Sequence, residues 1–193
     1  MRKATVAACF AAMTLCAAAR AEGAADFPEG MPETARAPFA AVAQLDGMLG
    51  AWRVTSEMAG PEGEWTNRTV YRQSFANGLR GLVLSEVHEA TLEGDGFALK
   101  TDFSFDQYKN VYRLAVLDDT FGLMDIYEGN IEEGVLIVTN LRADTSFPLG
   151  DGRKMNFRLR IPVAGNRREM FVDQSVDGGE TWAKFYRVVY ERI

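Results

Sequence analysis

From Ala51 onward, hydrophobic and polar residues alternate with a period of two, and this alternation strongly limits how the chain can fold. A period of two is the spacing of side chains on one face of a β-strand, whereas a helix repeats about every 3.6 residues. Within 97–106, for example, Phe103 and Phe105 share one face while Asp102 and Asp106 share the other. Such a segment indicates a strand with one dry and one wet face.

Ten segments show this pattern, and short turn sequences such as Asn77-Gly78 separate most of them. Because connections this short join neighbouring antiparallel strands, we expect successive hairpins. A sheet of this many long strands does not stay flat and open, and closure into a barrel removes its exposed edges. The sequence therefore predicts an all-β fold, an up-and-down antiparallel barrel of about 8 to 10 strands. The expected strands are 51–58, 64–75, 79–91, 97–106, 110–117, 121–128, 135–141, 154–163, 168–176 and 182–192.

One short amphipathic helix is expected before the first strand. Pro38 is tolerated in a first helical turn, and Gly50 is a stop signal. The hydrophobic residues between them recur at helical spacing, at Phe39, Val42, Leu45 and Met48 or Leu49.

The N-terminus has the layout of a secretory signal peptide. Arg2 and Lys3 precede an apolar run, and Ala19-Arg20-Ala21 offers a cleavage site before Glu22. We therefore expect residues 1–21 to be a signal peptide, 22–37 a flexible leader, and 38–193 one barrel domain in the periplasm or outside the cell. Cleavage would leave 172 of the 193 residues, enough for one substantial core.

Cleavage would also change the chemistry that the chain can perform. Cys9 and Cys16 are the two cysteines, and both lie in the predicted signal, so the mature chain would lack thiol nucleophiles, thiolate ligands and disulfides. Removal of three basic residues would shift the net charge from −6 to −9. A chain this acidic is a poor partner for nucleic acid or anionic lipid. We expect neither nucleic-acid binding nor membrane insertion after cleavage.

The second strand combines aromatic rings with hydrogen-bonding side chains on one face, more polar groups than a purely structural core commonly contains. A mostly apolar pocket with a few orienting polar groups has this character. We therefore predict that the barrel interior binds a small apolar or amphipathic molecule. The candidate ligand-binding residues are Asn67, Thr69, Tyr71, Gln73, Glu86, His88, Phe103 and Tyr112.

His88 is the single histidine of the chain, so it cannot build the sites of two or three histidines that catalytic zinc or non-haem iron usually requires. It could be structural, act as a general base beside Glu86, or ligate haem in a nitrobindin-like barrel. Alternation leaves two orientations open, because Glu86 and His88 share one face while Ser85 and Val87 share the other. We expect no metal, no cofactor and no assignable catalytic residue.

The sequence SVDGGETW at 175–182 matches the Asp-box pattern, in which an aspartate locks a hairpin turn through hydrogen bonds to nearby backbone. Propellers that carry this motif contain several copies, whereas this chain has one and is too short for six blades. The same stretch resembles a calcium loop, but Lys184 occupies the position where a bidentate glutamate is needed. The motif therefore predicts a structural turn.

Two motifs at the ends of the expected barrel resemble a known family. Leu49-Gly50-Ala51-Trp52 is similar to the Gly-x-Trp opening of lipocalin-type barrels, and the last strand ends in Tyr190-Glu191-Arg192. With the helix, the hairpins and the motif at 175–182 in this order, 45–193 most resembles the lipocalin-like DUF1579 family, a domain of unknown function. The resemblance implies that Trp52 lies at the closed end of a barrel and is covered by Arg192 or Arg187.

These observations favour an exported, small-ligand-binding barrel. Two other functions stay open: an enzyme, an isomerase or hydrolase, that uses Glu86 and His88 in the same cavity, or a solid barrel that acts as an envelope interaction module.

Overall fold

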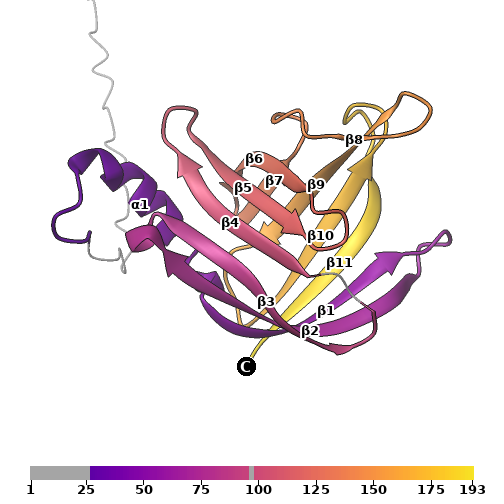
Figure 1. Cartoon of the computed structure of the whole chain (residues 1–193), viewed down its shortest axis with the longest axis horizontal. Coiled ribbons are helices and arrows are strands. Elements are labelled where there is room, and N and C mark those ends of the chain that lie inside the picture. Colours follow the sequence, from indigo (N-terminus) through magenta and orange to yellow (C-terminus); the bar gives the residue numbers. More distant parts are fainter. Residues whose placement is uncertain (1–26, 96–97) are drawn as a thin grey trace, which may run out of the picture.

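A computed structural model describes residues 27–95 and 98–193, and it forms an antiparallel β-barrel (Figure 1). Neighbouring strands pair in chain order from β1 to β7, β9 follows β7, and pairing of β9 with β10 closes the ring of ten through β11 and β1. The prediction of an up-and-down barrel is therefore confirmed. The strands are β1 Gly50–Ala59, β2 Trp65–Gly78, β3 Val83–Glu93, β4 Leu99–Asp106, β5 Val111–Asp118, β6 Met124–Glu132, β7 Val135–Thr139, β8 Phe147–Pro148, β9 Lys154–Pro162, β10 Arg167–Ser175 and β11 Ala183–Arg192.

Helical turns precede the barrel, and they are shorter than the expected helix. A 3₁₀ turn, η1 (Glu33–Ala35), leads into the helix α1 (Arg36–Ala43), and a second 3₁₀ turn, η2 (Asp46–Met48), comes before β1. Figure 1 shows α1 beside the barrel, and it contacts β4. The break between α1 and η2 allows the chain to turn from the side of the barrel toward its end. A third turn, η3 (Leu79–Gly81), replaces the start of the strand expected at 79–91.

Trp52 closes one end of the barrel. Its side chain is fully buried, and its indole Nε1 donates a hydrogen bond to the carbonyl oxygen of Met48, 2.8 Å away. The guanidinium of Arg192 lies 4.3 Å from the indole and donates to the carbonyl oxygens of Gly47 and Leu49. Arg192 thus covers Trp52, one of the two implied arrangements, and ties η2 to the last strand.

The other implied cation, Arg187, lies elsewhere. Its guanidinium is 4.7 Å from the ring of Trp65 and pairs with Glu57 and Glu169. Its neighbour Val188 lines the barrel interior, so alternation points Arg187 outward. Arg187 therefore packs on the outer face.

The Asp-box sequence forms the predicted turn between β10 and β11. The Asp177 carboxylate accepts hydrogen bonds from the backbone nitrogen and the hydroxyl of Thr181, and from the hydroxyl of Ser175. These bonds hold the pKa of Asp177 well below its usual value. The aspartate is fully occupied by its own hairpin, as a structural turn requires.

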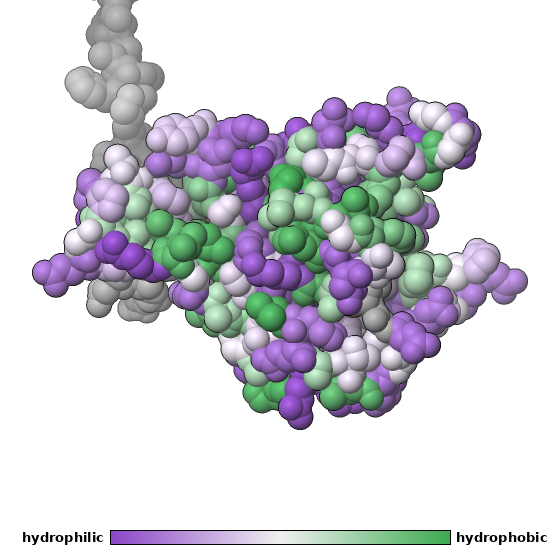
Figure 2. Space-filling model, in the orientation of Figure 1, coloured by the Kyte–Doolittle hydropathy of each residue, from purple (hydrophilic) through white to green (hydrophobic). Residues whose placement is uncertain are grey.

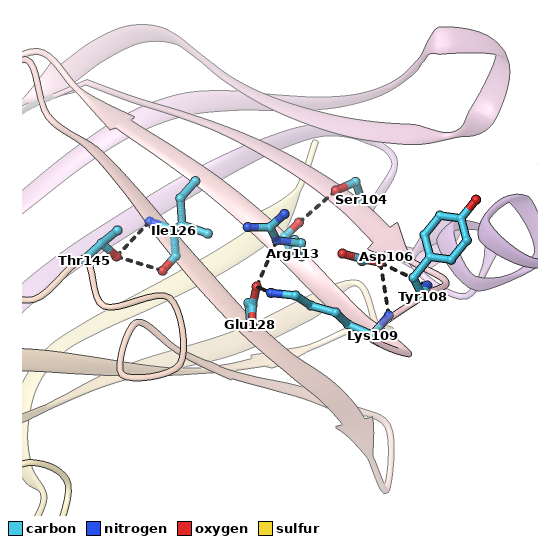
Figure 3. A network of polar contacts seen from close by, with 8 residues as sticks. All are labelled: Ser104, Asp106, Tyr108, Lys109, Arg113, Ile126, Glu128 and Thr145. Carbon is cyan, nitrogen blue, oxygen red and sulfur yellow. Dashed lines mark hydrogen bonds and ion pairs between the residues drawn. The ribbon is translucent and has the colours of Figure 1, made fainter.

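The outer face of β4 to β6 is held by charge pairs (Figure 3). Glu128 is almost fully buried, and one of its oxygens lies 3.0 Å from both Lys109 Nζ and Arg113 Nε. Asp106 accepts hydrogen bonds from the backbone nitrogens of Tyr108 and Lys109, which shapes the tight turn between β4 and β5. These contacts leave the inner faces of the same strands to the core.

The predicted signal peptide, 1–21, lies outside the described residues, as does the first part of the predicted leader. The later part of that leader contains η1 and the start of α1, and Phe27 makes an edge contact with Phe39. Within 27–95 and 98–193, no helix is long and apolar enough to cross a bilayer.

Candidate functional site

The barrel encloses a cavity of about 470 Å³. At the closed end it is bounded by Met48 of η2, and at the other end it reaches Thr120 and Phe121 in the connection between β5 and β6. Phe121 is 75% exposed, so the cavity meets the surface at this loop. Figure 2 shows hydrophobic residues at the surface on the face in view, bordered by hydrophilic ones. The barrel interior is therefore hollow and approachable from one end.

Most of the lining is aromatic or aliphatic. Strands from around the barrel contribute side chains to this lining, because inward positions alternate with outward ones along each strand. The apolar and aromatic lining residues are Met48, Met58, Tyr71, Leu99, Phe103, Leu114, Val116, Phe121, Tyr127, Phe147, Met155, Phe157, Leu159, Ile161, Met170, Val172, Phe185, Tyr186, Val188 and Tyr190.

Four of the eight predicted site residues line this cavity: Tyr71, Gln73, Glu86 and Phe103. They come from β2, β3 and β4, which are adjacent in the sheet. The register also resolves the orientation of β3, because Glu86 pairs with the inward Phe75 and Leu84 with the inward Phe103. The face that carries Glu86 and His88 is therefore the inner one.

Two predicted residues of β2 do not reach the cavity. Asn67 is exposed, and the alternation that placed it on the inner face is broken by a β-bulge opposite Glu57. Asn67 itself has a φ of 51°, a left-handed backbone conformation that interrupts the regular alternation of side chains between the two faces. Thr69 is buried on the inner side, but its hydroxyl donates to the carbonyl oxygen of Asp95 at 3.4 Å. The prediction is therefore corrected at both positions: Asn67 lies on the surface, and Thr69 is buried in the barrel wall without lining the cavity.

The other two predicted site residues, His88 and Tyr112, do not line the cavity and contact neighbouring groups instead. The ring of His88 lies 5.3 Å from that of Tyr71, and its Nε2 is 3.3 Å from the hydroxyl of Thr91. It stands on the inner face but behind the residues that line the cavity. The hydroxyl of the buried Tyr112 does not line the cavity but donates to the carbonyl oxygen of Ala41 in α1, at 2.8 Å. Its role is to dock the helix.

A cluster of buried polar groups surrounds Glu86. Its carboxyl accepts a hydrogen bond from the hydroxyl of Tyr190 at 3.0 Å, and side-chain bonds from Thr101 and Gln73 also favour its charged form. Thr101 is the cross-strand neighbour of Glu86 on β4. Four chemically different side chains from β2, β3, β4 and β11 therefore converge on one point of an otherwise apolar wall.

Burial dominates the ionisation of this cluster. Removal from water raises the pKa of Glu86 although its three hydrogen-bond donors and the nearby Arg168 act in the opposite direction. Burial, together with the carboxyl of Glu86, also raises the pKa of Tyr190 well above its usual value. Tyr190 thus stays a hydrogen-bond donor across the physiological range.

A Glu86→Gln substitution tests this environment. A carboxyl whose pKa is raised on folding binds more protons in the folded state, so its contribution to stability falls as pH rises through the window between its unfolded and folded pKa values. Glutamine has nearly the same shape and no charge. We expect the variant to unfold at a higher temperature than the parent at pH 7, with the advantage shrinking near pH 4. A variant that is less stable at pH 7 would show that Glu86 is favourably ionised.

Arg168 lies beneath this cluster. Its side chain is almost fully buried, and its guanidinium lies 4.2 Å from the ring of Trp52 and 4.8 Å from that of Tyr190. It donates one hydrogen bond, to the carbonyl oxygen of Pro162. Burial lowers its pKa, whereas the nearby Glu86 opposes that effect. Alternation could have placed Arg168 inside the barrel, since it precedes the inward Met170 by two residues.

A second polar cluster, around Asp125 on β6, was not predicted from the sequence. Asp125 lines the cavity and accepts hydrogen bonds from Asn140 Nδ2, at 3.1 Å, and from the hydroxyl of Thr145. Asn140 in turn accepts from the backbone nitrogen of Phe157, which ties β6 to β9. The position of Asp125 two residues before the inward Tyr127 was a usable signal, but Asn140 and Thr145 come from loops without periodicity.

No metal site is formed by the described ranges, in which no three His, Cys, Asp or Glu side chains are grouped suitably for an ion. The cavity is therefore characterised by its apolar wall and by the clusters at Glu86 and Asp125.

In a comparison with known families, the profile of DUF1579, described as a protein of unknown function, matches residues 37–192. The chain belongs to the DUF1579 family. No curated protein matches its sequence. Among solved structures, Rv2717c from M. tuberculosis is similar at 16% identity with a TM-score of 0.53, over 79% of this chain and 97% of that one. At this identity the likeness concerns the fold alone.

Proposed function

We propose that this DUF1579 protein is an exported barrel that binds a small apolar or amphipathic molecule in its interior. The cavity carries the proposal: its volume of about 470 Å³ lies within the range of ligand pockets, about 300 to 1,000 Å³. An apolar wall with a few convergent polar groups is the usual composition of such pockets. The predicted signal peptide at 1–21 supports export.

The hollow interior argues against a solid barrel as the functional unit. The enzyme alternative needs Glu86 and His88 to face one substrate, and the two stand in different surroundings. Glu86 lines the cavity, whereas His88 packs beside Tyr71. A general base acts within hydrogen-bonding reach of the proton it removes, so this arrangement favours binding over acid–base catalysis by that pair.

Filling the cavity is expected to weaken ligand binding. Val116 lies in the middle of β5 and lines the cavity between Thr101 and Asp125. A Val116→Trp variant would place an indole in the space that a ligand requires. We expect the affinity for the neutral fluorescent probe N-phenyl-1-naphthylamine to fall at least tenfold, about 1.4 kcal/mol. The measurement is a fluorescence titration, with circular dichroism to check that the variant is folded.

The neighbouring residue provides a matched control. Ala115 precedes Val116 on the same strand and pairs with Asp102 and Ile126 on the outer face. Ala115→Trp adds a larger side chain at the same depth of the strand but outside the cavity, so probe affinity should stay within about twofold of the parent. Equal losses in both variants, or no saturable binding to the parent chain, would contradict an interior site.

A further inference from the structure

Two buried polar atoms beside the Glu86 cluster have no partner. Gln73 is 2% exposed, and its Oε1 makes no hydrogen bond within the described part of the chain. The same holds for Nδ1 of His88. The two residues form a cross-strand pair between β2 and β3, and such partners have Cβ atoms about 4.5 to 5.5 Å apart. A buried polar group left without a partner costs about 1 to 3 kcal/mol, so a pair of them needs an explanation.

The polar groups that face the cavity have mostly used their donors. The hydroxyls of Tyr190 and Thr101 and the amide of Gln73 all engage the Glu86 carboxyl. What remains on Gln73 is its carbonyl oxygen, which can only accept. An occupant of this part of the cavity must therefore offer a donor to Gln73.

The contact with an occupant is left to Gln73, because His88 stands behind the residues that line the cavity. Its ring nitrogen Nε2 contacts the Thr91 hydroxyl, and the tautomer decides whether Nδ1 donates or accepts. A hydroxyl group can donate its single hydrogen to Gln73 Oε1. An aliphatic or aromatic body attached to this hydroxyl would lie against the apolar wall.

The charged groups near the cavity disfavour a ligand with an anionic head group. The nearest buried cation, Arg168, has its guanidinium against the rings of Trp52 and Tyr190, and it is not among the residues that line the cavity. A carboxylate in the cavity would meet Glu86 before it could reach Arg168. A cationic head would leave Arg168 without the negative charge that Glu86 supplies. An uncharged head disturbs neither.

We propose that the ligand is an uncharged molecule with an apolar body and a hydroxyl group, and that this hydroxyl donates a hydrogen bond to Gln73 Oε1 beside Glu86. This inference rests on the proposed function, because it assigns a chemical class to the occupant of the same cavity.

Three matched probes test the proposal on the full-length protein. Naphthalene has only an apolar body, 2-naphthol adds a hydroxyl, and 2-naphthoate adds an anionic carboxylate at pH 7. We expect 2-naphthol to bind about tenfold more tightly than naphthalene, and 2-naphthoate to bind more weakly than either. Dissociation constants would be measured by isothermal titration calorimetry.

A substitution then locates the hydroxyl. Gln73→Met keeps the length of the side chain and removes its carbonyl oxygen, so the preference for 2-naphthol over naphthalene should fall to about twofold or less while naphthalene affinity is kept. Gln107 is exposed in the turn between β4 and β5, and Gln107→Met should leave the full preference intact. If Gln73→Met does not fold, Gln73→Asn, which withdraws the amide, should give the same loss.

The outcomes separate the two claims. If neither naphthalene nor 2-naphthol binds, the proposed function fails, and the assignment of the hydroxyl fails with it. If naphthalene binds as tightly as 2-naphthol, or 2-naphthoate binds most tightly, the cavity is a binding site but the hydroxyl assignment is overturned. A preference for 2-naphthol that survives Gln73→Met would overturn the location.

Discussion

A Trp52→Ala variant is expected to lose about 3 to 5 kcal/mol of stability, the range for truncation of a large buried aromatic side chain. Trp52 is fully buried at the closed end, so alanine would leave a cavity there. The loss also removes the ring between two guanidinium groups, Arg168 at 4.2 Å and Arg192 at 4.3 Å. Each such contact contributes about 0.5 to 2 kcal/mol, more when it is desolvated.

Arg168 makes the expected loss large. Its Nε and Nη2 are buried and have no hydrogen-bond partner in the described ranges, so ring faces provide much of what stabilises this cation. Without Trp52 the guanidinium keeps the rings of Phe75 and Tyr190, at longer distances. Urea denaturation followed by circular dichroism would measure the change in the free energy of unfolding.

Trp65 offers the matched control on the outer face. It is half-buried, and its ring lies 4.7 Å from the guanidinium of Arg187. Trp65→Ala removes the same side chain and one cation–π contact but leaves no hole in the core, so we expect a loss of no more than about 2 kcal/mol. Equal losses in the two variants would mean that the closed end is not a centre of stability.

Gly129→Ala is the second substitution with a large expected effect. Gly129 lies on β6 opposite Val138 of β7. A methyl group there would overlap the carbonyl oxygen of Ile137 and lie 2.8 Å from the Cα atom of Val138. These are backbone atoms that cannot rotate away, so β6 and β7 would have to separate. We expect a loss of about 3 kcal/mol, the upper part of the usual range for overpacking.

The control is Gly134→Ala in the turn that joins the same two strands. Gly134 has a φ of +79°, but a methyl group there would meet no heavy atom within 4 Å. The cost is then limited to the left-handed backbone conformation, about 1 to 2 kcal/mol. Thermal and urea unfolding of both variants would show whether the close contact of the strands or the turn is more sensitive. A smaller loss for Gly129→Ala than for Gly134→Ala would contradict the close approach of β6 and β7.

Much of the fold could be predicted because strand formation is local. Alternation placed ten strands with boundaries close to those observed, and turn residues separated them. The largest differences occur at 79–81, which forms η3, at β6, which lies three to four residues later than expected, and at the helix expected from Pro38 onward, which breaks after Ala43. The short strand β8 was not predicted. In the structure, the Tyr112 hydroxyl donates a hydrogen bond to the carbonyl oxygen of Ala41, near the end of α1.

The candidate site was predicted only in part. Period-two alternation gave the correct inward residues of β2, Tyr71 and Gln73, where that strand is regular. It left the orientation of Glu86 open, and the register of β3 against β2 and β4 decided it. Alternation was wrong at Asn67, where a bulge opposite Glu57 inserts one extra residue into β2. Beyond a bulge, the side chains that alternation assigns to the inner face lie on the outer face, and the local sequence contains no signal that predicts the bulge.

The sequence by itself determined that this chain is an all-β barrel and that its interior mixes aromatic with polar side chains, because strand periodicity and turn chemistry act between near neighbours. Only the tertiary structure decided which of those side chains reach the cavity, that Glu86 is met by Tyr190 from the last strand, and that Arg168 lies under the ring of Trp52. Those contacts join residues about a hundred positions apart, as in the Tyr190–Glu86 bond with its separation of 104. They exist only once the sheet has closed, and closure is set by the register of every strand pair together.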